Sequence, residues 1–204
     1  MIVEYFGIPG SGKTFQAKLF KEKLRQDGIK YVDISRYSGM PLWLKLFYKF
    51  ADYFIMILPK YRKQIAEYRE VCKNCPKEPA FVPFSLDYCI MDIVLYSLVN
   101  DVFSHSRNIV VNDEGQLHRI LFLVVQYGCS LNRVMDIYFS HKHDETVRYV
   151  KTSVENAFQN IKIRNRKVCP MDEMDDKLLM EYIKAFEKTC EVAKNFYFNG
   201  IEIV

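Results

Sequence analysis

Eight residues near the N-terminus combine glycines, a lysine and a hydroxyl group at a spacing suited to holding phosphate. Residues 7–14 read GIPGSGKT and match the pattern G-x-x-x-x-G-K-[ST] in full. Glycines let the backbone curl so that successive N–H groups point at one anion, and a following helix adds its partial positive charge. Lys13 can then reach the outer phosphates of a triphosphate, and the Thr14 hydroxyl can ligate Mg²⁺. The residues expected to bind the nucleotide are Gly7, Pro9, Gly10, Ser11, Gly12, Lys13 and Thr14.

An acidic pair follows a second short apolar run. Residues 108–112 (NIVVN) read as a strand and are followed by Asp113, Glu114 and Gly115. A phosphate-binding loop needs an acid at the tip of a neighbouring strand to hold Mg²⁺, usually through water, and Asp113 fits that position. Glu114 can accept a proton from an attacking hydroxyl or water. The alternative is a plain acidic turn.

The hydrophobic pattern around these motifs alternates between strands and helices. Residues 1–34 read as strand, helix, strand, a unit that implies a parallel sheet with a right-handed crossover. The predicted strands are 1–6, 29–34, 108–112, 134–140 and 200–204, and the predicted helices between them are 14–26, 116–128, 144–160 and 172–197. We therefore predict a three-layer α/β domain with a parallel sheet of about five strands, formed by residues 1–34 and 108–204.

Residues 35–107 break the alternation and read as a helical insert between the second and third strands. Its predicted helices are 41–58, 60–72 and 85–104. The first is unusual, because Lys45, Lys49 and Asp52 form a narrow polar stripe on a helix that is otherwise large and apolar. It could be buried within the insert, lie on a membrane or a lipid-linked acceptor, or form a homodimer interface.

Composition sets the broad class. The chain has 204 residues, half of them hydrophobic, and a net charge of +4 that suits an anionic ligand. It has no apolar run of the roughly 18 residues that a membrane-spanning helix needs. The first residues lack a signal-peptide pattern, so we expect a cytoplasmic protein with reduced thiols. Cys72-x-x-Cys75 matches half of a zinc-site pattern, but no second such pair exists and the other four cysteines are scattered. His141 and His143 could complete a site only through an accident of folding, so the sequence does not favour zinc.

The loop resembles that of the P-loop NTPases. Its G-x-P-G-S-G-K form, close to the N-terminus, looks most like the nucleoside and nucleotide kinases, including adenylate- and thymidylate-kinase-like proteins. The resemblance covers the predicted core but not residues 35–107. It implies binding of ATP or GTP with Mg²⁺ and transfer of the γ-phosphoryl group to an acceptor. The sequence departs from the family at Asp113-Glu114, because many nucleotide kinases have Asp-Arg or Glu-Arg there, whereas hydrolysing ATPases often have Asp-Glu.

The resemblance also suggests where a lid and an acceptor would be held. Glu145-x-x-Arg148, expected to open a helix after the fourth strand, is similar to the segment leading into the lid of nucleotide kinases. Four of the six residues in 162–167 are cationic, and arginine suits phosphate oxygens. The candidates for stabilising transfer are Arg148, Arg164 and Arg166. A solvated basic loop is the alternative, and no aromatic stacking motif supports sequence-specific nucleic-acid binding.

Two further arginines are candidates for binding the acceptor. Arg36 follows the second strand, at the edge where ligands of α/β sheets bind, and Arg119 lies on the helix after Gly115. The insert, residues 35–107, would help clamp the acceptor. Because an acceptor without its own phosphate needs a base, Glu114 favours a hydroxyl acceptor such as a nucleoside or sugar over a nucleoside monophosphate.

Three functions therefore fit the sequence. The leading hypothesis is a small-molecule kinase. The alternative is a nucleotide-dependent ATPase or switch acting on a macromolecular partner, and the third is a nucleotide-binding protein without turnover. A guanine-specific GTPase is disfavoured, since no N/T-K-x-D tetrapeptide is present.

Overall fold

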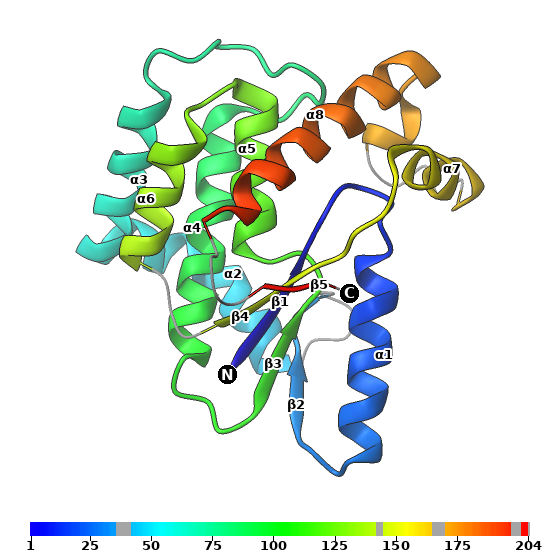
Figure 1. Ribbon diagram of the computed structural model, residues 1–204. Helices are drawn as coiled ribbons and strands as arrows, with labels where there is room; N and C mark the ends of the chain where they lie inside the picture. The colour runs from blue at the N-terminus through cyan, green and yellow to red at the C-terminus, as the bar shows by residue number, and fades with distance from the viewer. Residues whose placement is uncertain (36–41, 142–144, 165–169, 197–200, 204) are drawn as a thin grey trace.

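The computed structural model describes residues 1–35, 42–141, 145–164, 170–196 and 201–203. A parallel sheet of five strands in the order β2-β3-β1-β4-β5 forms its centre (Figure 1). The strands are β1 (Ile2–Phe6), β2 (Tyr31–Asp33), β3 (Ile109–Asn112), β4 (Glu145–Tyr149) and β5 (Ile201–Ile203). The predicted class, an α/β domain with about five parallel strands, is confirmed.

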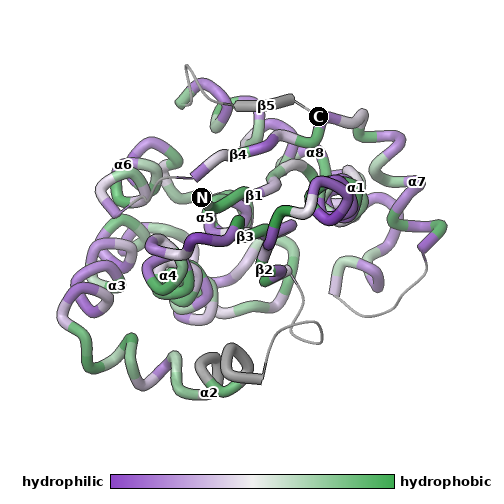
Figure 2. The backbone as a smooth tube through the Cα atoms, turned by 90° about the horizontal axis from the view of Figure 1, so that it is seen from below, coloured by the Kyte–Doolittle hydropathy of each residue, from purple (hydrophilic) through white to green (hydrophobic). Residues whose placement is uncertain are grey.

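Helices cover both faces of the sheet, because the central strand β1 has buried apolar side chains on both of its sides. Val3 and Tyr5 pack with Ala17 and Leu24 of α1, whereas Ile2 packs with Val99 and other residues on the opposite face. Viewed from below, α1 and α7 lie on one side of the sheet, and α3, α4 and α6 on the other (Figure 2). The helices are α1 (Lys13–Gln26), α2 (Leu42–Ile57), α3 (Pro59–Cys72), α4 (Leu86–Phe103), α5 (Gln116–Tyr127), α6 (Leu131–His141), α7 (Val154–Arg164) and α8 (Asp176–Lys194).

The prediction of a strand over residues 134–140 was wrong, because this segment lies in helix α6. Its buried residues are Val134, Met135 and Tyr138, which share one helical face, while Arg133 and Asp136 are exposed. The apolar residues are so dense here that the helical period is hidden.

The fourth strand is instead β4, which the sequence analysis assigned to the start of a helix over 144–160. Only Val147 and Tyr149 of β4 are fully buried, and the strand carries two charged residues. Both charges find hydroxyl partners on other elements: the Tyr138 hydroxyl donates to Glu145, and Arg148 donates to the Tyr5 hydroxyl at 2.9 Å. The helix in this region begins only at Val154.

The insert between β2 and β3 is helical, as predicted, and consists of α2, α3 and α4 within the described residues. Helix α3 begins at a proline, which suits the first turn of a helix, and Ser85 caps α4 by accepting a hydrogen bond from the Tyr88 amide at 3.2 Å. Buried side chains of α3 and α4 share one hydrophobic cluster with α5 and α8. Among the described residues, no helix is long and apolar enough to cross a membrane.

Candidate nucleotide-binding site

The glycine-rich loop runs between β1 and α1 and is fastened to α7. Gly10 has φ of +81°, in the region that favours glycine, and a Cβ there would lie 2.4 Å from the carbonyl oxygen of Ala157. The Asn160 amide donates to the Gly10 carbonyl at 2.9 Å. These contacts with helix α7, which also carries Arg164, therefore hold the loop in place.

Lys13 is buried at the start of α1, with 4% of its side chain exposed. Its Nζ donates to the carbonyl oxygens of Gly7 and Ile8, each at 3.1 Å, and lies 3.8 Å from Oε1 of Glu114. Burial lowers the pKa of Lys13, and the negative charge of Glu114 opposes this shift. The ammonium group thus lies beside both the loop and the acidic pair.

A chain of hydrogen bonds joins the start of α1 to the ends of β2 and β3. The Thr14 hydroxyl donates to Oδ2 of Asp113 at 2.6 Å, and the Asp113 amide donates to the Ser35 hydroxyl at 3.1 Å. The Ser35 amide in turn donates to Oδ1 of Asp33 at 3.0 Å. Burial raises the pKa of Asp113, while the hydrogen bond from Thr14 lowers it.

The oxygens of Thr14 and Asp113 suit a hard divalent cation. A hydroxyl and a carboxylate lie in direct contact beside a loop rich in N–H donors, and Mg²⁺ prefers oxygen ligands of this kind next to phosphate. These two residues therefore fit the magnesium site that the sequence analysis expects.

Glu114 is half-exposed, with 46% of its side chain accessible, and sits among cations. Burial opposes ionisation of Glu114, but the positive charges of Lys13, Arg119 and Arg164 hold its pKa below the ordinary value. His118 lies 3.9 Å away on α5, and burial lowers its own pKa to about 3. At neutral pH the imidazole is therefore uncharged and Glu114 is a carboxylate facing Lys13.

These groups border a cleft of about 720 Å³, large enough for a small ligand. The cleft brings together most of the predicted site residues: Gly10, Ser11, Gly12, Lys13, Thr14, Asp113, Glu114 and Arg164. The predicted residues Gly7 and Pro9 do not line it. The described residues that line it are Gly10, Ser11, Gly12, Lys13, Thr14, Phe15, Lys18, Lys21, Asp33, Ser35, Asp113, Glu114, Asn160 and Arg164.

Several residues that line the cleft were not predicted from the sequence. Thr14, Lys18 and Lys21 follow the spacing i, i+4, i+7, which places them on one face of α1, so helical spacing could have revealed the two lysines. Lys21 donates to Asp33 at 2.6 Å. Asn160 carried no such signal, because its place beside Gly10 depends on how α7 packs.

The other predicted arginines lie elsewhere or outside the described residues. Arg148 lies on β4, where its guanidinium stacks 4.0 Å from the ring centre of Phe20. Arg119 pairs with Asp92 of α4 at 3.0 Å and donates to the Tyr96 hydroxyl at 3.0 Å. Neither is among the residues that line the cleft. Arg36 and Arg166 fall outside the described residues.

Kinases are among the solved structures with a similar fold. A deoxyadenosine kinase from M. mycoides with the products dCMP and dCDP bound has a TM-score of 0.52 and 18% identity, and the match covers 100% of this chain and 90% of that one. The same enzyme with dATP bound has a TM-score of 0.51, 17% identity and the same coverage. A shikimate kinase from Bacteroides thetaiotaomicron has a TM-score of 0.47 and 14% identity, covering 100% and 85%.

The two deoxyadenosine kinase structures show that this chain shares their overall α/β fold. At such identities the likeness establishes the fold and leaves the substrate to be argued from the site. No protein-family model and no curated protein sequence matches the chain.

Proposed function

We propose that this protein is a phosphotransferase that moves the γ-phosphoryl group of ATP or GTP to a small-molecule acceptor. The observation that carries the proposal is the convergence of Lys13, Thr14, Asp113 and Glu114 on one cleft at the carboxyl ends of β1 and β3. The loop amides and Lys13 would bind the phosphates. Thr14 and Asp113 would hold Mg²⁺, which neutralises phosphate charge when bound.

Arg164 would stabilise the charge that develops on the transferred group. It lines the cleft from α7 and is positioned by Asp172, whose carboxylate accepts its hydrogen bond at 2.8 Å. Guanidinium groups in such fixed positions lower the barrier of phosphoryl transfer. Asn160 lies one turn before Arg164 on α7. Its hydrogen bond to the Gly10 carbonyl fixes the position of this helix relative to the loop.

Glu114 is the proposed proton acceptor. It is ionised, partly exposed and beside Lys13, and phosphate oxygens bound to Lys13 would offset its charge and raise the pKa of Glu114 towards its ordinary range. Asp33 lines the same cleft, but Lys21 and the Ser35 amide each hold one of its oxygens. Glu114 is therefore the freer base, which supports a hydroxyl acceptor such as a nucleoside or sugar over a monophosphate.

The test is nucleotide consumption across a panel of acceptors. ATP and GTP turnover would be measured with Mg²⁺ and a series of nucleosides, monophosphates and sugars. We expect turnover with one acceptor class, reduced at least about 100-fold in Lys13→Ala. The matched control is Lys23→Ala, which removes an exposed lysine from the same helix. If no acceptor in the panel stimulates turnover, a small-molecule kinase acting on these classes is excluded.

The second candidate function is an ATPase or switch, which Glu114 favours because a carboxylate at this position can also orient water. The same assay separates the two functions. Turnover that is lost in Lys13→Ala but independent of any small acceptor would support the ATPase, and binding without turnover would support neither enzyme.

The insert, residues 35–107, is the proposed acceptor-binding region, and α2 bears on the kind of acceptor. Seven large apolar side chains at this helix and its end are exposed: Leu46, Phe50, Tyr53, Phe54, Met56, Ile57 and Leu58. We propose that this surface contacts a membrane that presents a lipid-linked acceptor. Co-sedimentation with phospholipid vesicles should fall when Phe50 and Met56 are both replaced by Ser. Concentration-dependent self-association without vesicle binding would instead indicate a homodimer interface.

A further inference from the structure

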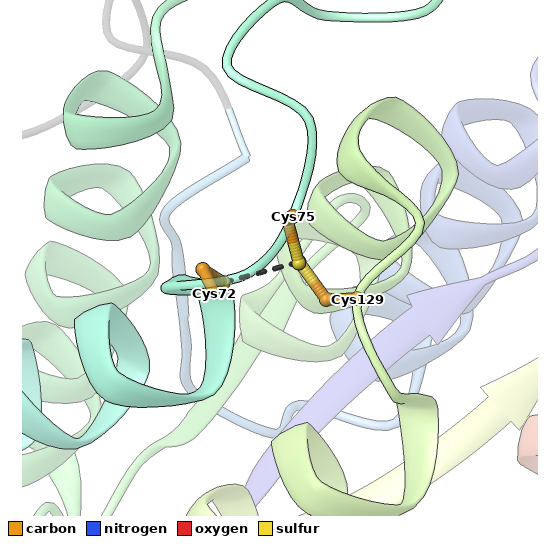
Figure 3. A group of neighbouring side chains, drawn as sticks. All are labelled: Cys72, Cys75 and Cys129. Atoms are coloured by element: carbon orange, nitrogen blue, oxygen red, sulfur yellow. Dashed lines mark hydrogen bonds between the residues drawn. The ribbon is translucent and has the colours of Figure 1, made fainter.

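Three cysteines from distant parts of the chain converge outside the nucleotide cleft (Figure 3). Cys72 ends α3, Cys75 lies in the turn that follows, and Cys129 comes directly after Gly128, which ends α5. The sulfur of Cys129 is 3.0 Å from that of Cys72 and 3.2 Å from that of Cys75. All three sulfurs lie within 4.8 Å of one another.

The backbone around the three cysteines holds them in place. The Cys75 amide donates to the Cys72 carbonyl at 3.0 Å, which closes the turn between them. Gln126, three residues before Cys129, accepts hydrogen bonds from Ala80 through its backbone and from the Phe81 and Val82 amides through its side chain. The segment after Cys75 is thereby tied to the same end of α5, and the cluster is preorganised.

Two simpler explanations account for less of this arrangement. A disulfide would join two of the thiols and leave the third beside them without a role. Cysteines packed only as small apolar groups have no need to meet sulfur to sulfur. Cys-x-x-Cys with a third cysteine is instead a common ligand set for zinc.

The size of the cluster also suits a metal. Zn–S bonds of about 2.3 Å in a tetrahedron place sulfurs roughly 3.8 Å apart, so the observed pairs would need to separate by less than about 1 Å. Cys72 and Cys129 are buried, whereas Cys75 is partly exposed. Solvent can therefore reach the fourth coordination position from the side of Cys75.

We propose that Cys72, Cys75 and Cys129 bind one Zn²⁺ ion that fastens the end of α3 to the junction of α5 and α6. The site is structural and separate from phosphoryl transfer. Its ion would hold the insert, through α3 and the segment that follows it, against the helix that begins at the acidic pair of the cleft.

The test measures metal directly. The full chain, purified under reducing conditions with zinc in the growth medium, should contain about one zinc per chain by elemental analysis. Cys72→Ser and Cys129→Ser should lower this to background, while Cys190→Ser, which alters a buried cysteine on α8, should retain it. Because the first two variants could fail to fold, cobalt is also added to the metal-depleted wild type. It should give the thiolate-to-cobalt charge-transfer band and visible absorption of tetrahedral sulfur coordination.

Removing zinc should lower the unfolding temperature of the wild-type protein, and returning zinc should restore it. The proposal is overturned if the wild type binds neither zinc nor cobalt stoichiometrically, or if peptide mapping finds a disulfide between any two of the three cysteines in the reduced preparation. None of these measurements depends on catalytic activity, so they stand apart from the test of the kinase proposal.

Discussion

Gly115 lies so close to Glu4 that a Cβ on Gly115 would be 2.3 Å from the carboxyl carbon of Glu4. On its other side, Oε1 of Glu4 accepts a hydrogen bond from the Leu117 amide at 2.6 Å, so this buried acid of β1 caps the start of α5. Asp113 and Glu114 immediately precede this junction. The glycine is required by the close approach, since its φ of −85° suits any residue.

The Gly115→Ala variant tests this contact. Because the carboxyl group cannot retreat from its buried position without losing the cap, we expect a loss of about 1–3 kcal/mol in the free energy of unfolding. Nucleotide affinity should fall as well, since the acidic pair must shift. In a double-mutant cycle, Glu4→Ala should remove much of the penalty of Gly115→Ala. An equal penalty in both backgrounds would show that the contact is unimportant.

Glu4 should also make stability depend on pH. Burial, reinforced by the charge of Glu145, raises the pKa of Glu4 from 4.5 to about 8. Between these values the unfolded chain loses the proton while the folded chain keeps it. The free energy of unfolding should therefore fall with rising pH, by up to about 1.4 kcal/mol per pH unit from this group.

Chemical unfolding of Glu4→Gln across that pH range measures the effect. The variant stays neutral at every pH, so its stability should depend less steeply on pH than that of the wild type. Glu181→Gln, at an exposed position of α8, serves as the control and should keep the wild-type slope. Parallel slopes for the wild type and Glu4→Gln would rule out a proton held by Glu4.

Arg164→Ala should reduce turnover by about 100- to 1000-fold, because it removes the donor that we propose stabilises the transferred group. Arg164→Lys should recover only part of the loss, since a lysine lacks the planar fork. Binding of the nucleotide itself should change less than the turnover number. Arg62→Ala, an exposed arginine on α3, is the control. If the variant lost only nucleotide affinity and kept its turnover number, Arg164 would act in nucleotide binding and not in phosphoryl transfer.

Arg119→Ala should mainly affect stability. The guanidinium links α5 to α4 through Asp92 and stacks 4.7 Å from the ring centre of Tyr96. Because the pair is partly exposed, the expected loss is about 1–3 kcal/mol, below the cost of breaking a fully buried pair. Urea unfolding measures this loss. A stable variant with a raised KM for the acceptor would instead support the role in acceptor binding that the sequence suggested.

The sequence predicted best what is encoded locally. The residues from Gly7 to Thr14 are contiguous, and Asp113 directly follows a short apolar strand, so both could be placed without knowing the packing. Strand β4 could not be predicted in this way. Its charged residues form hydrogen bonds with the hydroxyl groups of Tyr5 and Tyr138, which only the tertiary structure brings next to them. The neighbouring helix α6 was mistaken for a strand because its apolar residues hide the helical period.

The cysteine cluster shows the same limit at longer range. The spacing of Cys72 and Cys75 is visible in the sequence, but Cys129 lies more than fifty residues away, and nothing local connects it to them. His141, considered as a partner for the pair, contacts Glu67 at 3.0 Å, and His143 lies outside the described residues. Only the packing of α3 against α6 brings the third sulfur beside the other two.

The central position of β1 has a consequence for how the protein is made. Its two neighbours, β3 and β4, come from residues that the ribosome adds more than 100 positions later. The glycine-rich loop is therefore synthesised well before its acidic partner, Asp113, and before helix α7, which begins at Val154 and packs against it. Pairing between such distant segments closes long loops and slows folding. In the growing chain, the apolar β1 segment therefore stays unpaired until both of its neighbouring strands have been made.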